Sequence, residues 1–367
     1  MNLLCSVSGV TSAIFLCGIA AGCGPGAAVD SVRAGASNTE NPQDAEHARK
    51  RNAPPGGLSP EAEMLLPTVE GRLGQLALDR DRARLYVAAE DNGTLEVVDL
   101  ETKRRGRSIG GFQKPRGVLF LGELERVIVS NGGTGALIVL DARSYKRLET
   151  LDVGAGIGEI AFDPKTKLVY AALEGNAIAI VDTTGWKLAG KIDLSARASG
   201  FALEPNGVRL FANVQPNGAI DVFDRSARKA LGHWSLDAFQ ADGPLLSVDD
   251  GARLFATSRE PAKLVVIETL TGTKVGGTEL AGACGDLIYD APTDRLFVPC
   301  ASGVLQVFTR VGAGRFTLSN SLGTGVGATT GLFDPPTHKL YVALPAVLEK
   351  DGKTTRPARV LSFEDLP

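Results

Sequence analysis

A short stretch that returns seven times along the chain predicts an all-β protein, a single seven-bladed β-propeller with four-stranded blades. Three observations lead to this expectation. The stretch recurs at a nearly constant spacing, and each repeat contains four strand-like runs. The N-terminal part of the domain also supplies a strand that the C-terminal part lacks.

The recurring stretch is first seen at residues 84–89, which read Arg-Leu-Tyr-Val-Ala-Ala. Its key aliphatic residue recurs at steps of 41 to 44 residues. A fixed period of about 40–45 residues with several strands per unit is typical of propellers. The seven aliphatic residues are Leu85, Val127, Leu168, Leu210, Leu254, Leu296 and Leu340.

The third repeat shows the four strands of a unit most clearly. We expect strands at residues 159–162, 167–172, 177–182 and 187–192, separated by turns rich in Asp, Pro, Gly and Asn. Short runs of β-branched and aliphatic residues between such turns are strand signals, and no run with helical periodicity interrupts them. Each unit therefore reads as one four-stranded blade.

The two ends of the domain complement each other. The seventh repeat stops after its third strand, at residues 359–363, with no fourth strand behind it. An extra strand at residues 65–69 precedes the first complete repeat. We expect this N-terminal strand to complete the last blade, which would close the ring and remove its exposed edges.

The first residues resemble a targeting segment. Residues 7–21 are largely apolar and too short for a good membrane-spanning helix. They end in Ala20-Ala21-Gly22-Cys23, which resembles the cleavage site of bacterial lipoproteins, where the cysteine is acylated. The segment departs from that pattern by lacking Lys and Arg at its start and by having Ala20 in place of the usual Leu. Ordinary signal cleavage, with Cys23 unmodified, is the alternative.

The sequence thus predicts three parts: a signal peptide at 1–22, a disordered tether at 23–60 and the propeller at 61–367. The tether is rich in Pro, Gly, Ser, Asn and charge, with almost no aliphatic residues. We expect an exported protein of the periplasm or cell envelope that is attached to the membrane through a lipid on Cys23. A plain N-terminal extension is the other interpretation of the tether.

Two cysteines of the propeller lie at equal distances from a predicted hairpin turn. Cys284 and Cys300 flank residues 290–294, and the midpoint between them is residue 292. Residues placed in this way face each other across an antiparallel ladder. Export would favour a disulfide between them. The alternative is a pair of small buried thiols.

Composition excludes several classes of function. The net charge is −3 and aromatic residues make up 6% of the chain, so no nucleic acid partner is expected. The histidines, His47, His233 and His338, fall in the tether, on an outer strand and in a turn. They do not converge on the channel, which argues against haem, a His-ligated metal and a Ser-His-Asp triad.

The repeat also resembles a known family. Residues 85–89, Leu-Tyr-Val-Ala-Ala, followed by residues 95–99, Leu-Glu-Val-Val-Asp, are similar to the YVTN repeat. The resemblance to YVTN/YncE-like seven-bladed propellers covers residues 64–367. It implies the fold but not one function, because that family includes binding proteins, proteins of no known activity and relatives of lactone hydrolases.

The channel mouth is the predicted site, since the first residues of the inner strands gather there. Glu159 and Asp286 could face a cation or a ligand amine, and Arg116 could bind an anion. The alternative is that these are solvated rim residues. The predicted ligand-binding residues are Gln75, Arg116, Glu159, Asp286 and Thr330.

We therefore expect a non-enzymatic binding or interaction module, acting through its channel mouth on an envelope protein or a small ligand. No cofactor is expected, although a divalent cation is compatible with the acidic residues. The alternative is a lactonase-type hydrolase whose divalent cation is held by rim carboxylates, and a third possibility is a role in assembly alone. The protein is expected to be a monomer.

Overall fold

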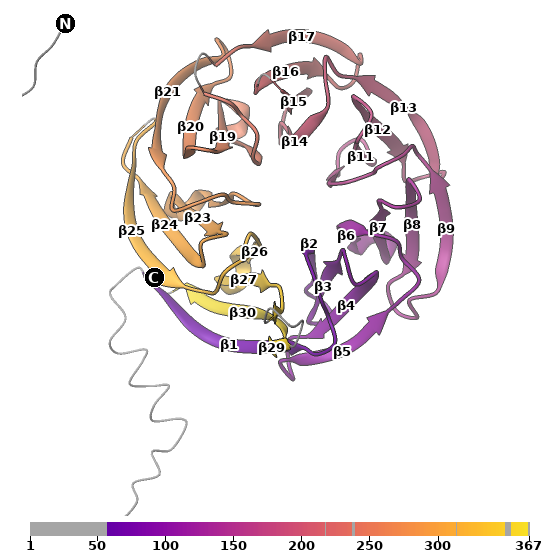
Figure 1. Cartoon of the computed structure of the whole chain (residues 1–367). Helices are drawn as coiled ribbons and strands as arrows, with labels where there is room; N and C mark the ends of the chain where they lie inside the picture. The colour runs from indigo at the N-terminus through magenta and orange to yellow at the C-terminus, as the bar shows by residue number, and fades with distance from the viewer. Residues whose placement is uncertain (1–56, 217, 237–238, 313, 349–353, 366–367) are drawn as a thin grey trace, which may run out of the picture. The chain divides into compact units, whose positions relative to one another are not determined.

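The computed structural model describes residues 57–365, except 217, 237–238, 313 and 349–353. These residues form a ring of seven four-stranded antiparallel sheets around a central channel (Figure 1). The predicted seven-bladed β-propeller is confirmed. The signal segment, Cys23 and most of the tether lie outside the described residues. No helix among the residues described is long and apolar enough to cross a membrane.

Within each blade the strands follow one another from the channel outward, and we call them a, b, c and d. Blade 1 contains β2 (Leu73–Asp79), β3 (Arg84–Ala89), β4 (Thr94–Asp99) and β5 (Arg104–Ile109). Blade 2 contains β6 (Pro115–Leu121), β7 (Arg126–Asn131), β8 (Ala136–Asp141) and β9 (Arg147–Asp152). Blade 3 contains β10 (Ile160–Asp163), β11 (Leu168–Leu173), β12 (Ala177–Asp182) and β13 (Lys187–Asp193).

The next three blades repeat this order. Blade 4 contains β14 (Ala198–Leu203), β15 (Arg209–Val214), β16 (Ala219–Asp224) and β17 (Lys229–Trp234). Blade 5 contains β18 (Leu245–Val248), β19 (Arg253–Arg259), β20 (Ala262–Glu268) and β21 (Thr273–Glu279). Blade 6 contains β22 (Ile288–Asp290), β23 (Arg295–Cys300), β24 (Val304–Arg310) and β25 (Phe316–Gly323).

Blade 7 is built from both ends of the domain. Its strands are β26 (Thr330–Asp334), β27 (Lys339–Leu344), β30 (Ala358–Asp365) and, as outer strand d, β1 (Leu58–Leu66). The small hairpin of β28 (Val347–Leu348) and β29 (Thr354–Arg356) is inserted between β27 and β30. The predicted closure by the N-terminal strand is therefore confirmed.

The closing strand begins earlier than the sequence suggested. It covers Leu58–Leu66 rather than residues 65–69, so the ring starts a few residues before the predicted boundary at 61. Pro60 is accommodated because the register shifts beside it, between Pro60 and Ala62. The strand buries Met64 and Leu66 almost completely, which makes it part of the core rather than an added edge.

The core lies between neighbouring blades, and strand b explains why. Successive side chains of a strand point to opposite faces, so Leu85 packs towards blade 7 while Tyr86 packs towards blade 2. Phe211 and Phe255 fill later interfaces in the same way. The recurring stretch is thus a two-sided strand that joins each blade to both of its neighbours.

The third repeat has a different register from the one that the sequence suggested. Leu168 is only partly buried, whereas Val169 is fully buried and packs towards blade 2, as Leu85 packs towards blade 7. Lys167 has the left-handed φ that Ala83 has in blade 1, two residues before the key position. The equivalent of Leu85 is therefore Val169, and the assignment of Leu168 as the key residue of this repeat is wrong.

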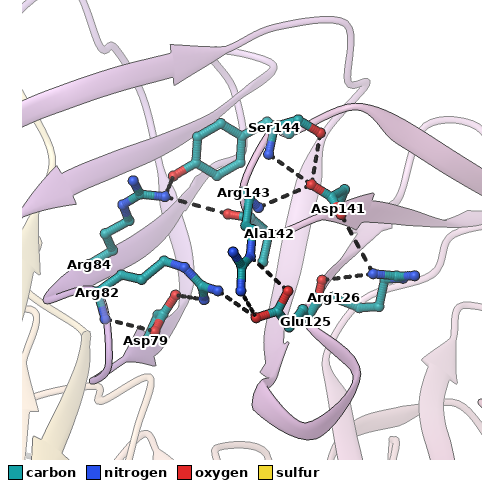
Figure 2. Close-up of polar contacts among 10 residues, drawn as sticks. Asp79, Arg82, Arg84, Glu125, Arg126, Asp141, Ala142, Arg143 and Ser144 are labelled. Carbon is teal, nitrogen blue, oxygen red and sulfur yellow. Dashed lines mark hydrogen bonds and ion pairs between the residues drawn. The ribbon is translucent and has the colours of Figure 1, made fainter.

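We call the face that carries the a–b and c–d turns the basal face, and polar contacts join its blades. Arg82 of blade 1 reaches Glu125 of blade 2 at 2.7 Å, and Arg143 binds the same carboxylate at 2.6 Å (Figure 2). A more buried pair, Arg225 and Asp163, joins blades 4 and 3 at 3.1 Å. These contacts supplement the apolar interfaces.

The two cysteines of blade 6 face each other, as the hairpin geometry predicted. Cys284 and Cys300 form an isolated β-bridge pair, and both are buried. Both are free thiols in this structure, so the predicted disulfide is not formed here. Burial raises the pKa of Cys284 to about 12 and that of Cys300 to about 11, which makes both thiols poor nucleophiles while reduced.

Candidate functional site

We call the face opposite the basal face the mouth face, because the d–a and b–c connections gather there around the channel opening. A cavity of about 500 Å³ lies at this opening. Its lining comes from all seven blades and contains every residue predicted for the site: Gln75, Arg116, Glu159, Asp286 and Thr330. The sequence therefore located the residues of this cavity correctly, and their role stays a prediction.

Glu159 and Asp286 come from blades 3 and 6 and interact across the channel. Burial raises the pKa of Glu159 to about 8, and the negative charge of Asp286 contributes to the increase. A backbone hydrogen bond from Phe201 and the positive charge of Arg116 act in the opposite direction. Glu159 is therefore mostly protonated at neutral pH. The sequence did not predict this interaction, because repeat spacing says nothing about the width of the channel.

Asp286 is held in a different environment from Glu159. Burial raises its pKa, but Thr330 Oγ1 donates to its carboxylate at 2.6 Å and the Gly331 N–H donates at 2.9 Å. Hydrogen bonds to a carboxylate favour the charged form. These two donors therefore act against the effect of burial on the pKa of Asp286. Among the described residues, neither carboxylate forms an ion pair.

Gln75 has a positional role that the sequence did not predict. Its side-chain amide bridges from blade 1 to blade 3, where Oε1 accepts from the Ile160 N–H at 3.1 Å and Nε2 donates to the Ile160 carbonyl at 3.3 Å. The bridge passes over Gly117 of blade 2. A Cβ at Gly117 would lie 2.7 Å from Ile160 and 2.8 Å from the Gln75 oxygen. The glycine at position 117 was the feature of the sequence that could have indicated this bridge.

Arg116 lies at the rim, with 43% of its side chain exposed. Its Nε is 3.5 Å from a carboxylate oxygen of Glu90, which also pairs with Arg72 at 3.0 Å. Glu90 is buried and divided between two cations, so neither guanidinium is fully neutralised by it. Arg116 can therefore still bind an anionic group that approaches from the solvent.

The rest of the rim carries further charges, including some that the sequence did not single out. Arg197 approaches Glu174 at 3.9 Å, and both side chains are more than half exposed. Asp242 accepts from the backbone N–H of Arg259 at 2.7 Å, and both residues line the cavity. Arg197 directly precedes the inner strand β14, and its place beside the start of an inner strand was the signal that could have identified it.

The arrangement separates charges by depth. Acids at the rim lie next to arginines, whereas the deeper Glu159 and Asp286 form no ion pair among the described residues, and burial raises the pKa of both. Such a pair can bind a ligand amine or a hydroxyl group by ionic and hydrogen bonds. Within the described residues, no group of three or more His, Cys, Asp or Glu side chains is placed to hold a metal ion.

The histidines of the propeller lie where the sequence placed them. His233 is on the outer strand β17, with Nδ1 2.7 Å from a carboxylate oxygen of Asp221. His338 closes the a–b turn of blade 7 with a left-handed φ of 52°. Neither lines the mouth cavity. His47 lies outside the described residues.

Comparisons with known proteins support the fold. No family model matches the chain. It is 25% identical over 146 residues to the seven-bladed beta-propeller protein Rv1057 of Mycobacterium tuberculosis, covering 38% of this chain and 37% of that protein. A chain of the Kuenenia stuttgartiensis hydrazine synthase is similar in structure, with a TM-score of 0.68, 15% identity, and 79% of this chain and 96% of that chain covered. Both likenesses indicate a β-propeller, and the second shows the fold alone.

Proposed function

We propose that the protein is an exported, membrane-tethered propeller that binds an envelope protein or a small ligand through its mouth face, without catalysis. The observation that carries this proposal is the cavity at the channel opening, where Glu159 and Asp286 lie deep and without a cationic partner. A site of this kind can bind a group that the protein itself does not provide. YVTN/YncE-like propellers, which the repeat resembles, include binding proteins.

The charges also indicate which groups a bound molecule would present. A cationic or hydroxyl group would meet the deep pair, and an anionic group would meet Arg116 at the rim. Because the rim is exposed and the deep pair is enclosed, a protruding side chain or a small polar molecule fits better than a flat surface. The partner class is thus one with a polar extension that enters the channel.

The test is a crosslinked pull-down from membranes. The wild-type protein is compared with a variant that carries Arg116→Gln, Glu159→Gln and Asp286→Asn, which removes the three charges and keeps the volume of the two acidic side chains. A matched control carries Lys191→Gln, Glu149→Gln and Asp193→Asn, on outer strands away from the cavity. We expect a specific partner with the wild type and the control that the site variant loses.

Retention of the partner by the site variant would contradict the proposal. The alternative, a lactonase-type hydrolase with a cation at Glu159 or Asp286, would appear as lactone hydrolysis that depends on an added divalent cation. That activity would also have to disappear in the site variant. Thermal unfolding of all three proteins is the control for folding.

A further inference from the structure

The outer wall of the propeller is charged differently at its two edges. In blades 1 to 6 the chain places an exposed basic residue at the c–d turn or at the first residues of strand d, which is the basal edge. We call these residues the basal collar: Lys103, Lys146, Lys187, Lys229, Lys274 and Arg315. The mouth edge shows the opposite sign, since strands β9, β13 and β21 end in exposed Asp152, Asp193 and Glu279.

The basal collar is largely free of internal partners. Lys103 pairs with Glu61 at 3.2 Å, but within the described residues the other five form no ion pair. Two acids on the same face pair instead with other cations: Glu123 with Lys167 at 2.6 Å, and Asp249 with Arg310 at 2.8 Å. Asp182 is held mainly by hydrogen bonds from Thr184, which lower its pKa, and the charge of Lys187 contributes less. The positive charge of the basal collar is therefore available to an outside anion, although the whole chain has a net charge of −3.

Exposed apolar residues accompany these cations. Leu148, Leu188 and Val275 each follow a basic residue in the sequence and are about 40% exposed. Leu270, on the c–d turn of blade 5, is 88% exposed. Basic side chains interspersed with exposed aliphatic ones are typical of surfaces that lie at a membrane interface.

The chain itself reaches the propeller at this edge. Leu58, the first residue of β1, pairs with Asp365 at the basal end of β30. Blade 7 has no collar lysine because its outer strand is this incoming segment, which carries Arg49, Lys50 and Arg51 in the sequence just before it. A membrane attachment through the N-terminus would therefore approach the basal face first.

We propose that the basal collar docks the propeller on an anionic lipid bilayer, with the channel mouth directed away from the membrane. The choice of a bilayer as the occupant rests on the proposed N-terminal tether. Each Lys or Arg near an anionic surface adds to the attraction, and the attraction falls as salt increases. Docking in this way leaves the mouth cavity open to a partner.

The test uses vesicles of phosphatidylcholine alone or mixed with phosphatidylglycerol. The protein is the chain from residue 23 onward with Cys23→Ser, which has no acyl chain and retains the whole self-closed ring. We expect sedimentation with the anionic vesicles only, and release by added salt. Three reversals in the basal collar, Lys187→Glu, Lys229→Glu and Lys274→Glu, should weaken binding by at least about a hundredfold.

A matched control carries Lys114→Glu, Lys191→Glu and Lys263→Glu, which change the net charge equally but lie at or near the mouth edge. It should bind far better than the collar variant. Leu270→Ser, at an exposed position that leaves the charge unchanged, should weaken binding severalfold through lost insertion.

Three results would overturn the proposal: equal binding to both kinds of vesicle, equal losses in the collar variant and the control, or binding of single-stranded RNA but not of vesicles. The pull-down variant at Arg116, Glu159 and Asp286 should still bind vesicles. Failure of the proposed function and failure of this inference are therefore distinguishable.

Discussion

The inner strands of the propeller end differently at the two faces of the ring. At the basal end, strand a closes in an Asp in blades 1, 3, 6 and 7, and at least two of these carboxylates pair with an arginine of a neighbouring blade. At the mouth end, the residues at or just before the start of strand a change from blade to blade and include two carboxylates that form no ion pair among the described residues. The regular end is built for stability, and the irregular end is where binding can be specific.

The largest effect should come from the basal end. Asp163 and Arg225 are each less than 5% exposed and form an ion pair at 3.1 Å. Asp163→Ala would leave the guanidinium buried without its partner, at a cost of about 3–5 kcal/mol. Urea unfolding followed by circular dichroism measures this loss, and a change below about 1 kcal/mol would mean that the basal pairs do not stabilise the ring.

The next effect concerns the mouth end of blade 6. Oxidation of Cys284 and Cys300 should stabilise the protein by about 3 kcal/mol relative to the reduced form, as the chain-entropy model gives for a loop of this length. The thiols must be labelled after unfolding without reductant, since their raised pKa values keep them unreactive in the folded protein in either case. Labelling of both cysteines in protein isolated from its native cells without reductant would contradict the disulfide.

A third substitution tests how tightly the residues around Gly117 are packed at the mouth. Gly117→Ala places a Cβ against Ile160 and the Gln75 amide, and overpacking of this kind costs about 1–3 kcal/mol. Gly200→Ala is the matched control, because its Cβ would be no closer than 3.4 Å to any neighbour. Similar melting temperatures for the two variants would show that the Gln75 bridge is not a constraint.

The fourth prediction uses the pH dependence of the mouth. The folded protein keeps a proton on Glu159 up to about pH 8, while the unfolded carboxyl releases it near its ordinary pKa of 4.5. The folded state therefore binds more protons between these values, and stability should fall as pH rises from 5 to 8.

Glu159→Gln should remove this slope, because the amide does not titrate. We expect the variant and the wild type to be similar at pH 5, and the variant to be more stable at pH 8 by about 3–4 kcal/mol. Thermal unfolding across this range gives the answer. Parallel curves for the two proteins would show that Glu159 is ionised throughout.

The smallest effect is again expected at the basal face, where an exposed ion pair should stabilise the protein far less than the buried pair of Asp163 and Arg225. Arg143 is 68% exposed, although it binds Glu125 with two short contacts (Figure 2). Solvent screens exposed pairs strongly, so Arg143→Ala should be nearly neutral in the same urea experiment. A loss as large as that of Asp163→Ala would mean that position on the face, rather than burial, determines the value of a pair.

Much of the fold followed from local signals. Strand b alternates between two interfaces, so the spacing of Leu85 and its equivalents gave the number of blades. The error at Leu168 arose because Leu168 and Val169 are both aliphatic, and only the left-handed turn at Lys167 distinguishes the two registers. The start of β1 was misplaced because Pro60 and the charges at Glu61 and Glu63 conceal a strand.

The residues of the candidate site were predictable, but their interactions were not. Repeat position alone placed Glu159 and Asp286 on the channel, because equivalent residues of a repeat occupy equivalent places in the ring. Their electrostatic coupling depends on distances across the channel, which no spacing within the sequence encodes. The bridge from Gln75 in blade 1 to Ile160 in blade 3 likewise requires a glycine at position 117 of blade 2, because a side chain there would occupy the space that the bridge crosses.

The strand that closes the ring also determines how the propeller responds to force. β1 pairs with β30 along its whole length, from Leu58 opposite Asp365 to Leu66 opposite Ala358. Ladder hydrogen bonds lie perpendicular to the strands, so a pull on the chain ahead of Leu58 loads them together in shear. A force applied to the chain at this point is therefore resisted by all the hydrogen bonds of the β1–β30 ladder together, rather than by one bond at a time.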